Sequence, residues 1–168
     1  MQPSEDLQIV LQTTYVLNSG STHCLHGGVD GFDKRRFKLV DKSENSLTYT
    51  LHSPDKDMGF PGNFDLTVVY TVTEDNELVI YYVGKCDQKT YACITNHAYF
   101  NLNGKNSSVL NHSVQIDSDY YLPLDKDSIP TGEKRKVDGG AFDFRQEKTL
   151  AKDFRRDPQM EAALGYDH

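Results

Sequence analysis

The chain of 168 residues is long enough to enclose one hydrophobic core, and we expect a single domain spanning residues 1–168. Its 25 acidic residues outnumber its 18 basic residues, and the resulting net charge of −7 disfavours binding to nucleic acid and to anionic membrane surfaces. No stretch approaches the roughly 18 apolar residues that a membrane-spanning helix requires. The first twenty residues lack a basic start followed by an apolar run, so we expect an unsecreted protein.

Short β-strands dominate the predicted secondary structure. The clearest is Phe64 to Val72, where apolar and aromatic residues alternate with mostly polar ones, a pattern typical of a strand with one buried face. The polar residues 74–77 then separate it from the β-branched and aromatic run 78–83, which predicts an antiparallel hairpin. The same reasoning predicts shorter strands at 36–40, 46–52, 95–102 and 113–116. Many short strands at close spacing favour a β-sandwich or a barrel.

Helix content is predicted to be small. Only residues 150–164 show a helical pattern, and Pro158 limits it to two short turns at most. The long segments 53–63 and 122–140 are predicted loops, and long ordered loops tend to carry function.

Three histidines occur in settings that suggest chemistry, because histidine can exchange a proton near neutral pH. His26 precedes two glycines, so it is either presented to a ligand or incidental to a tight turn. His97 lies in a predicted strand, where it is either catalytic or half-buried and bonded to a neighbour. The pair Asp167–His168 is either part of a site or a solvated terminus.

The remaining candidate sites are weaker. His23, Cys24 and His26 lack a second ligand group, because Cys86 and Cys93 are too far apart in sequence for a structural zinc site, and we expect no metal. Three cysteines cannot all pair within one chain, which favours a reducing cytoplasm. The basic run 134–136 is predicted to be a solvated turn.

Six segments follow one another after Tyr15 and Leu17: LHGGVDGFDKRRF (25–37), GFPGNF (59–64), TNHAYFNLNG (95–104), DSDYYLPLDKDSIPTGE (117–133), FDFR (142–145) and GYDH (165–168). In this order they resemble the galactose mutarotase, or aldose 1-epimerase, family. The resemblance covers nearly everything after residue 14.

The resemblance implies an all-β fold, an antiparallel β-sandwich of the galactose mutarotase type, here incomplete at both ends. It also implies interconversion of the α and β anomers of sugars such as D-galactose and D-glucose, without cofactor or metal, by a monomer. In that reaction a base removes the proton of the anomeric hydroxyl while an acid protonates the ring oxygen. The resemblance assigns the acid to His97, places His26 against the same sugar oxygens, and has Asp167 hydrogen-bond sugar hydroxyls.

Two family features have no counterpart in this sequence. The general base is a glutamate in a segment beyond the GYDH motif, and an Asn-Arg motif that contacts the sugar precedes LHGG. Removing one partner of an acid–base pair costs a factor of about 10²–10⁴ in rate, so we expect little activity from the chain alone. The alternatives are a non-catalytic carbohydrate-binding or regulatory protein and, less favoured, an enzyme of hexose 6-phosphates that would use the basic run 134–136.

Overall fold

The structure is a computed structural model that describes residues 14–20, 22–163 and 165–167. Internal contacts divide the chain into two compact units, one ending at Asn96 and the other beginning at His97. Each unit is described by itself below. The single domain expected over residues 1–168 stays a prediction.

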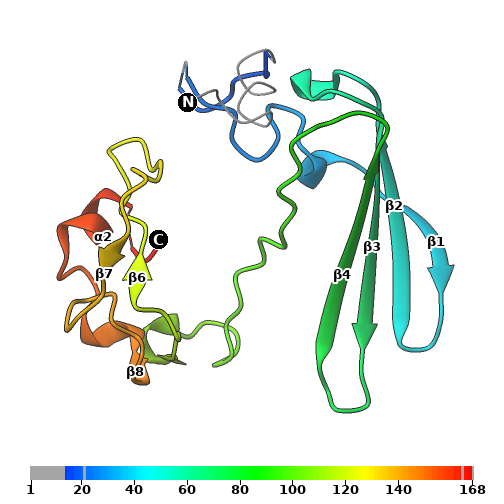
Figure 1. Ribbon diagram of the computed structural model, residues 1–168. Helices are drawn as coiled ribbons and strands as arrows, with labels where there is room; N and C mark the ends of the chain where they lie inside the picture. Colours follow the sequence, from blue (N-terminus) through cyan, green and yellow to red (C-terminus); the bar gives the residue numbers. More distant parts are fainter. Residues whose placement is uncertain (1–13, 21, 164, 168) are drawn as a thin grey trace. The chain divides into compact units, whose positions relative to one another are not determined.

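The first unit is built on an antiparallel sheet of four strands arranged in chain order (Figure 1). The strands are β1 (Lys38–Lys42), β2 (Ser46–Ser53), β3 (Phe64–Val72) and β4 (Leu78–Cys86). A tight turn joins β3 to β4, in which the Thr73 hydroxyl accepts a hydrogen bond of 3.1 Å from the backbone N–H of Glu77. The predicted hairpin is therefore confirmed.

Burial on this sheet is concentrated in the middle of β3. Leu66 and Val68 are only 2% and 5% exposed, whereas Val72 at the end of the strand is 53% exposed. The turn that joins β3 to β4 lies at the same end of the sheet as the turn that joins β1 to β2 (Figure 1). The prediction of one buried face along β3 therefore holds at its centre and is wrong at its end.

Two short 3-10 helices accompany the sheet, η1 (Phe32–Lys34) and η2 (Asp57–Gly59). The helix η2 lies inside the segment 53–63 that the sequence predicts as a loop. Phe32 stacks on Phe64 with ring centroids 6.2 Å apart, which connects η1 to the start of β3.

The second unit contains only short elements. They are η3 (Val109–Asn111), β5 (Ser113–Val114), β6 (Tyr120–Tyr121), β7 (Arg135–Lys136), β8 (Lys148–Thr149), η4 (Leu150–Lys152) and α2 (Pro158–Ala162). Strand β5 pairs antiparallel with β8, and β6 pairs antiparallel with β7. The prediction of at most two short helical turns in residues 150–164 is confirmed by η4 and α2.

The helix α2 contributes to the core of the second unit. Met160 is fully buried, and Asp157 caps the helix by accepting a hydrogen bond of 2.9 Å from the backbone N–H of Gln159. The Gln159 side-chain amide then bonds both backbone groups of Leu124, at 2.7 and 3.2 Å, as a neighbouring strand would. A helix of five residues is too short to persist without such contacts.

Other predictions of secondary structure need correction. The strand predicted at 36–40 runs from Lys38 to Lys42. The segment 95–102 is extended but belongs to none of the sheets described, because β-propensity alone does not make a strand without a hydrogen-bonding neighbour (Figure 1). The strand predicted at 113–116 ends at Val114. The basic run is not a turn, because Arg135 and Lys136 form β7. Within the described residues, no helix has the length and apolar character to cross a membrane.

Candidate active site

His26 occupies a turn of unusual backbone geometry. His26, Gly27 and Gly28 have φ angles of 52°, 83° and 95°, all in the left-handed region. Glycine adopts this region freely, but a histidine there is strained, and such strain persists only where surrounding contacts enforce it. The Asn18 side chain is one of those contacts, since it accepts from the N–H of Leu25 at 2.7 Å and donates to its carbonyl at 2.9 Å.

A second set of contacts secures the turn from its C-terminal side. The backbone of Gly31 approaches so closely that a Cβ at this position would lie 2.3 Å from the carbonyl oxygen of His26. The Arg35 guanidinium donates to the Asp30 carbonyl through Nε at 3.0 Å and through Nη2 at 2.6 Å. His26 itself is exposed, so these contacts present its side chain on a held backbone.

Arg35 also links this turn to η2 through Asp57. Two guanidinium nitrogens donate to the Asp57 carboxylate, and the Ser53 hydroxyl donates to it at 2.5 Å. The bonds to Arg35 hold the pKa of Asp57 below its usual value, and the bonds to Asp57 raise the pKa of Arg35. The two side chains are only 12% and 15% exposed, which makes them a largely shielded ion pair.

The GFPGNF motif stabilises the adjoining loop of the same unit. The Asp55 carboxylate accepts from the backbone N–H of Gly62 at 2.6 Å, and the Asn63 side chain bonds the backbone N–H of Asp55 and the carboxylate of Asp87. These bonds join the β2–β3 connection to the end of β4. The motif is therefore structural in the first unit.

His97 is the first residue of the second unit and is exposed. Its ring lies against Tyr99 with centroids 5.2 Å apart, and Tyr99 is 91% exposed. After it, the Asn101 side chain accepts from the N–H of Asn103 at 3.0 Å and donates to the Ser107 carbonyl at 2.8 Å. The polar half of the TNHAYFNLNG motif therefore shapes a turn, while its first half presents rings to solvent.

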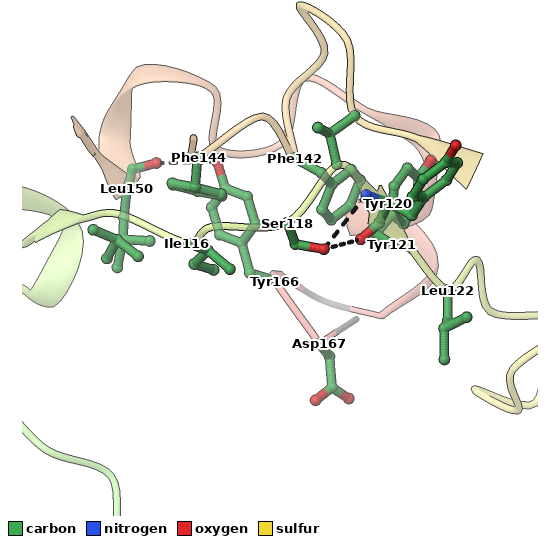
Figure 2. A pocket seen from close by; sticks show the side chains of 12 residues that line it. Ile116, Ser118, Tyr120, Tyr121, Leu122, Phe142, Phe144, Leu150, Tyr166 and Asp167 are labelled. Carbon is green, nitrogen blue, oxygen red and sulfur yellow. Dashed lines mark hydrogen bonds between the residues drawn. The ribbon is translucent and has the colours of Figure 1, made fainter. Parts of the chain in front are cut away.

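Asp167 lies on the wall of a hollow in the second unit, with a volume of about 710 Å³ (Figure 2). Most of the other lining side chains are apolar or aromatic. They include Ile116, Tyr120, Tyr121, Leu122, Phe142, Phe144 and Tyr166. A carboxylate at the edge of an apolar hollow is suited to bonding a hydroxyl of a ligand whose other parts contact the wall.

Tyr166, the residue before Asp167, is held in place by aromatic contacts. Its ring meets Phe142 edge-on at 5.8 Å and Phe144 at 5.2 Å, and its hydroxyl donates to the carbonyl of Leu150 at 3.4 Å. Burial raises the pKa of Tyr166. Edge-to-face contacts of this kind fix the orientation of a ring and also bury its apolar surface. The fixed ring of Tyr166 therefore sets the position of the backbone from which the Asp167 side chain projects.

The FDFR motif supplies the aromatic partners of Tyr166 and the charges that fix them. Arg145 bonds Asp143 through two nitrogens at 2.9 and 2.7 Å and reaches Asp119 at 2.8 Å. The bonds from Arg145 hold the pKa of Asp143 well below its usual range. The motif therefore ties its own loop to the residues preceding β6.

Lys148 completes this support. Its side chain is 8% exposed, and its ammonium donates to Asp153 and to the Ala141 carbonyl, both at 2.8 Å, above the ring of Phe144 at 4.4 Å. The bond from Lys148 lowers the pKa of Asp153. No sequence pattern predicts a role for Lys148 or Tyr166. The local signal nearest to them is the recurrence of aromatic residues in the FDFR and GYDH motifs.

The predicted site residues fall in different units. His97 and Asp167 belong to the second unit and His26 to the first, and the structure describes the surroundings of each. Of His168, the fourth residue of GYDH, nothing is described. Within the described residues there is no cluster of three or more potential metal ligands, and the three cysteines are free thiols. The basic run carries carboxylate partners, with Arg135 bonded to Glu133 at 2.8 Å and Lys136 near Asp138 at 4.0 Å.

Comparison with known proteins agrees with the motifs. The family model described as aldose 1-epimerase matches residues 12–168. The chain is 42% identical over 157 residues to the aldose 1-epimerase of Escherichia coli (strain K12), a match that covers 94% of this chain and 45% of that protein. It is 43% identical over 129 residues to the galactose mutarotase of Homo sapiens, covering 76% of this chain and 37% of that protein.

Solved structures give the same result. The galactose 1-epimerase of Lactobacillus acidophilus NCFM superimposes with a TM-score of 0.83 at 31% identity, over 93% of this chain and 47% of that one. An aldose epimerase homologue from C. elegans gives a TM-score of 0.74 at 35% identity, over 81% of this chain and 42% of that one. The predicted antiparallel all-β fold of the galactose mutarotase type is confirmed. The chain spans less than half the length of these relatives, and it belongs to the aldose 1-epimerase family.

Proposed function

We propose that the domain to which this chain contributes is an aldose 1-epimerase that interconverts the α and β anomers of aldohexoses such as D-galactose and D-glucose. The observation that carries this proposal is the family match over residues 12–168, which includes the motifs around His26, His97 and Asp167. The aldose 1-epimerase and the galactose mutarotase that support it are more than twice as long as the regions that match this chain.

His97 is the proposed general acid that protonates the ring oxygen as the sugar ring opens. Its exposure supports this role, because the imidazole is accessible to a ligand, and the ring of Tyr99 lies beside it. The acid must lie within hydrogen-bond reach of the ring oxygen, so loss of the imidazole removes the proton-transfer step itself.

His26 and Asp167 are the proposed sugar-binding residues, with His26 also assisting at the reacting oxygens. The enforced left-handed backbone at His26 and the aromatic anchoring of Tyr166 support these roles, because both side chains project from backbone positions held by their neighbours. Polar groups held in this way favour sugars with a hydroxyl at the matching position and reject sugars that lack it.

A second candidate is a carbohydrate-binding protein that does not catalyse mutarotation. It is favoured by one observation, that Asp167 lies on the wall of a largely apolar hollow, where a carboxylate can bond a sugar hydroxyl without any proton transfer. Under either candidate we propose a single copy of the chain acting in the cytoplasm on a small sugar, without metal or cofactor.

The test follows anomer exchange of freshly dissolved α-D-galactose by NMR, with near-UV circular dichroism as the check of folding. If the chain accelerates exchange, His97→Ala should lose the acceleration by a factor of about 10²–10⁴. His52→Ala is the matched control, because His52 is an exposed histidine paired with Asp65 at 2.7 Å on the sheet of the first unit. Saturable galactose binding without acceleration would favour the second candidate, and a folded chain that neither binds nor accelerates would contradict both for this chain alone.

A further inference from the structure

Three pairs in the sequence place a glycine directly after an aspartate or an asparagine: Asp30–Gly31, Asn103–Gly104 and Asp138–Gly139. At such a pair the backbone nitrogen of the glycine can attack the carbonyl carbon of the preceding side chain, because glycine has no Cβ to obstruct the approach. The attack requires the glycine nitrogen to lose its proton and the peptide to rotate toward the side chain. The structure restrains the three pairs to different degrees.

Both aspartate–glycine pairs are held by hydrogen bonds. Gly31 is buried, and the Asp30 carbonyl accepts from the Arg35 guanidinium at 3.0 and 2.6 Å, which fixes the peptide that would have to rotate. The N–H of Gly139 donates to the Asp143 carboxylate at 2.9 Å. A hydrogen bond to a carboxylate is stronger than one to a neutral acceptor, so this bond keeps the proton on the nitrogen of Gly139.

The asparagine–glycine pair is open by comparison. Asn103 and Gly104 are exposed, and a Cβ placed on Gly104 would have no heavy atom of a non-neighbouring residue within 4 Å. The N–H of Gly104 donates to the Asn101 carbonyl at 3.3 Å, which is a long bond to a neutral acceptor. The Asn103 amide donates to the Ser108 carbonyl at 3.1 Å, also at the surface. Bonds in an exposed turn open far more often than bonds in a core.

We propose that Asn103 is a site of spontaneous deamidation. The Gly104 nitrogen loses its proton to water and bonds to the Cγ atom of Asn103, the bond from Cγ to Nδ2 breaks, and ammonia leaves. The product is a five-membered succinimide ring. Water then opens the ring at either carbonyl, giving aspartate or isoaspartate. No atom is oxidised or reduced, and water is the only co-reactant.

The product disturbs the turn in which it forms. The Ser108 carbonyl loses the Asn103 amide as a donor and faces a carboxylate instead, which repels it. The Ser108 hydroxyl also caps η3, since it accepts from the backbone N–H of Leu110 at 3.2 Å. Deamidation therefore loosens residues 101–108 and the start of η3. It also adds a negative charge to the TNHAYFNLNG motif, which contains His97.

The experiment incubates the folded full chain in a mildly alkaline buffer and follows each asparagine by proteolytic digestion and mass spectrometry. Asn103 should acquire the mass of a deamidated residue, and electron-transfer fragmentation should find both aspartate and isoaspartate there. Asn106, which lies in the same exposed segment but precedes Ser107, is the internal control. It should react about tenfold more slowly, because the serine side chain obstructs the attack.

A matched pair of substitutions tests the role of Gly104. Gly104→Ala should slow the reaction at Asn103 by about tenfold, whereas Gly132→Ala should leave its rate unchanged. The two glycines have similar φ angles, 82° and 86°, and both have open space around them. Near-UV circular dichroism checks that both variants are folded.

Unfolding the chain in guanidinium tests the effect of the structure itself. Isomerisation of Asp30 and Asp138 should speed up by about tenfold or more, because their restraints are lost, whereas the rate at Asn103 should change by less than about threefold. The proposal is overturned if Asn103 does not react in the folded chain, if Asn106 reacts as fast, if Gly104→Ala has no effect, or if unfolding accelerates Asn103 as much as the two aspartates. Each of these results leaves the proposed epimerase chemistry to its own NMR test.

Discussion

Removal of the Arg35 side chain is expected to destabilise the first unit. Arg35→Ala deletes the two bonds to the Asp57 carboxylate and the two to the Asp30 carbonyl. Loss of one partner costs about 3–5 kcal/mol in a fully buried ion pair, whereas an exposed pair contributes about 1 kcal/mol or less. Asp57 is 12% exposed and keeps the Ser53 hydroxyl as a donor, so we expect a loss of about 2–3 kcal/mol.

The contribution of this pair depends on pH in a defined direction. The pKa of Asp57 is lowered in the folded chain, so the unfolded chain takes up the proton first as the pH falls. The stabilisation is therefore fully present above the unfolded pKa of about 3.9 and declines as the pH falls from there through the folded pKa. The difference in stability between the unchanged chain and Arg35→Ala should narrow below about pH 4.

Urea unfolding followed by circular dichroism measures both effects. Arg36→Ala is the matched control, because Arg36 is exposed and should change stability by no more than about 0.5 kcal/mol. Arg35→Lys should recover only part of the loss, because an ammonium cannot reproduce the forked contact with a carboxylate. The reasoning is refuted if Arg35→Ala unfolds at the same urea concentration as Arg36→Ala, or if its deficit is unchanged at pH 3.

Two further substitutions test the supports of the candidate site. Gly31→Ala places a Cβ 2.3 Å from the His26 carbonyl oxygen and should lower the free energy of unfolding by about 2 kcal/mol or more. Gly132→Ala, at a φ of 86° with open space around it, should lower it by only about 1 kcal/mol. Equal urea midpoints for the two variants would contradict this reasoning. Tyr166→Phe removes only the hydrogen bond to the Leu150 carbonyl and should lower the free energy of unfolding by less than about 1 kcal/mol. Tyr166→Ala also removes the ring, so it should lower that free energy by about 3 kcal/mol and broaden the NMR signals of Asp167. Identical thermal unfolding of the two variants would refute the anchoring role.

Local patterns predicted the local parts of the fold. The hairpin of β3 and β4 was predictable because alternation, a polar turn and a β-branched return strand all lie within about twenty consecutive residues. The pairing of β6 with β7 was not, because Tyr120 and Lys136 are partners across a segment with no alternation of its own. The strand predicted at 95–102 failed for the same reason, since a strand is completed by a neighbour that its own sequence does not specify.

The candidate site was likewise predictable from the sequence only in part. The three residues named by the resemblance were available from the sequence, because each lies inside a short motif. The contacts that hold them were not, since Asn18 reaches Leu25 across seven residues and Phe142 reaches Tyr166 across a much longer segment. Side-chain contacts between distant residues leave no periodic signal in either partner.

There is a physical reason why the motifs extend beyond the proposed site residues. In GYDH the ring of Tyr166 fixes the backbone from which Asp167 projects, and in LHGGVDG the close approach of Gly31 fixes the carbonyl of His26. FDFR contains none of the proposed site residues, yet Phe142 and Phe144 provide two of the surfaces on which Tyr166 rests. The proposed site would hold a sugar at several hydroxyls, and such a site requires its side chains to be fixed by neighbours. The LHGGVDG and GYDH motifs therefore each combine a proposed site residue with a residue that orients it. Substitutions in these supporting residues should weaken the proposed sugar binding without any contact to the sugar.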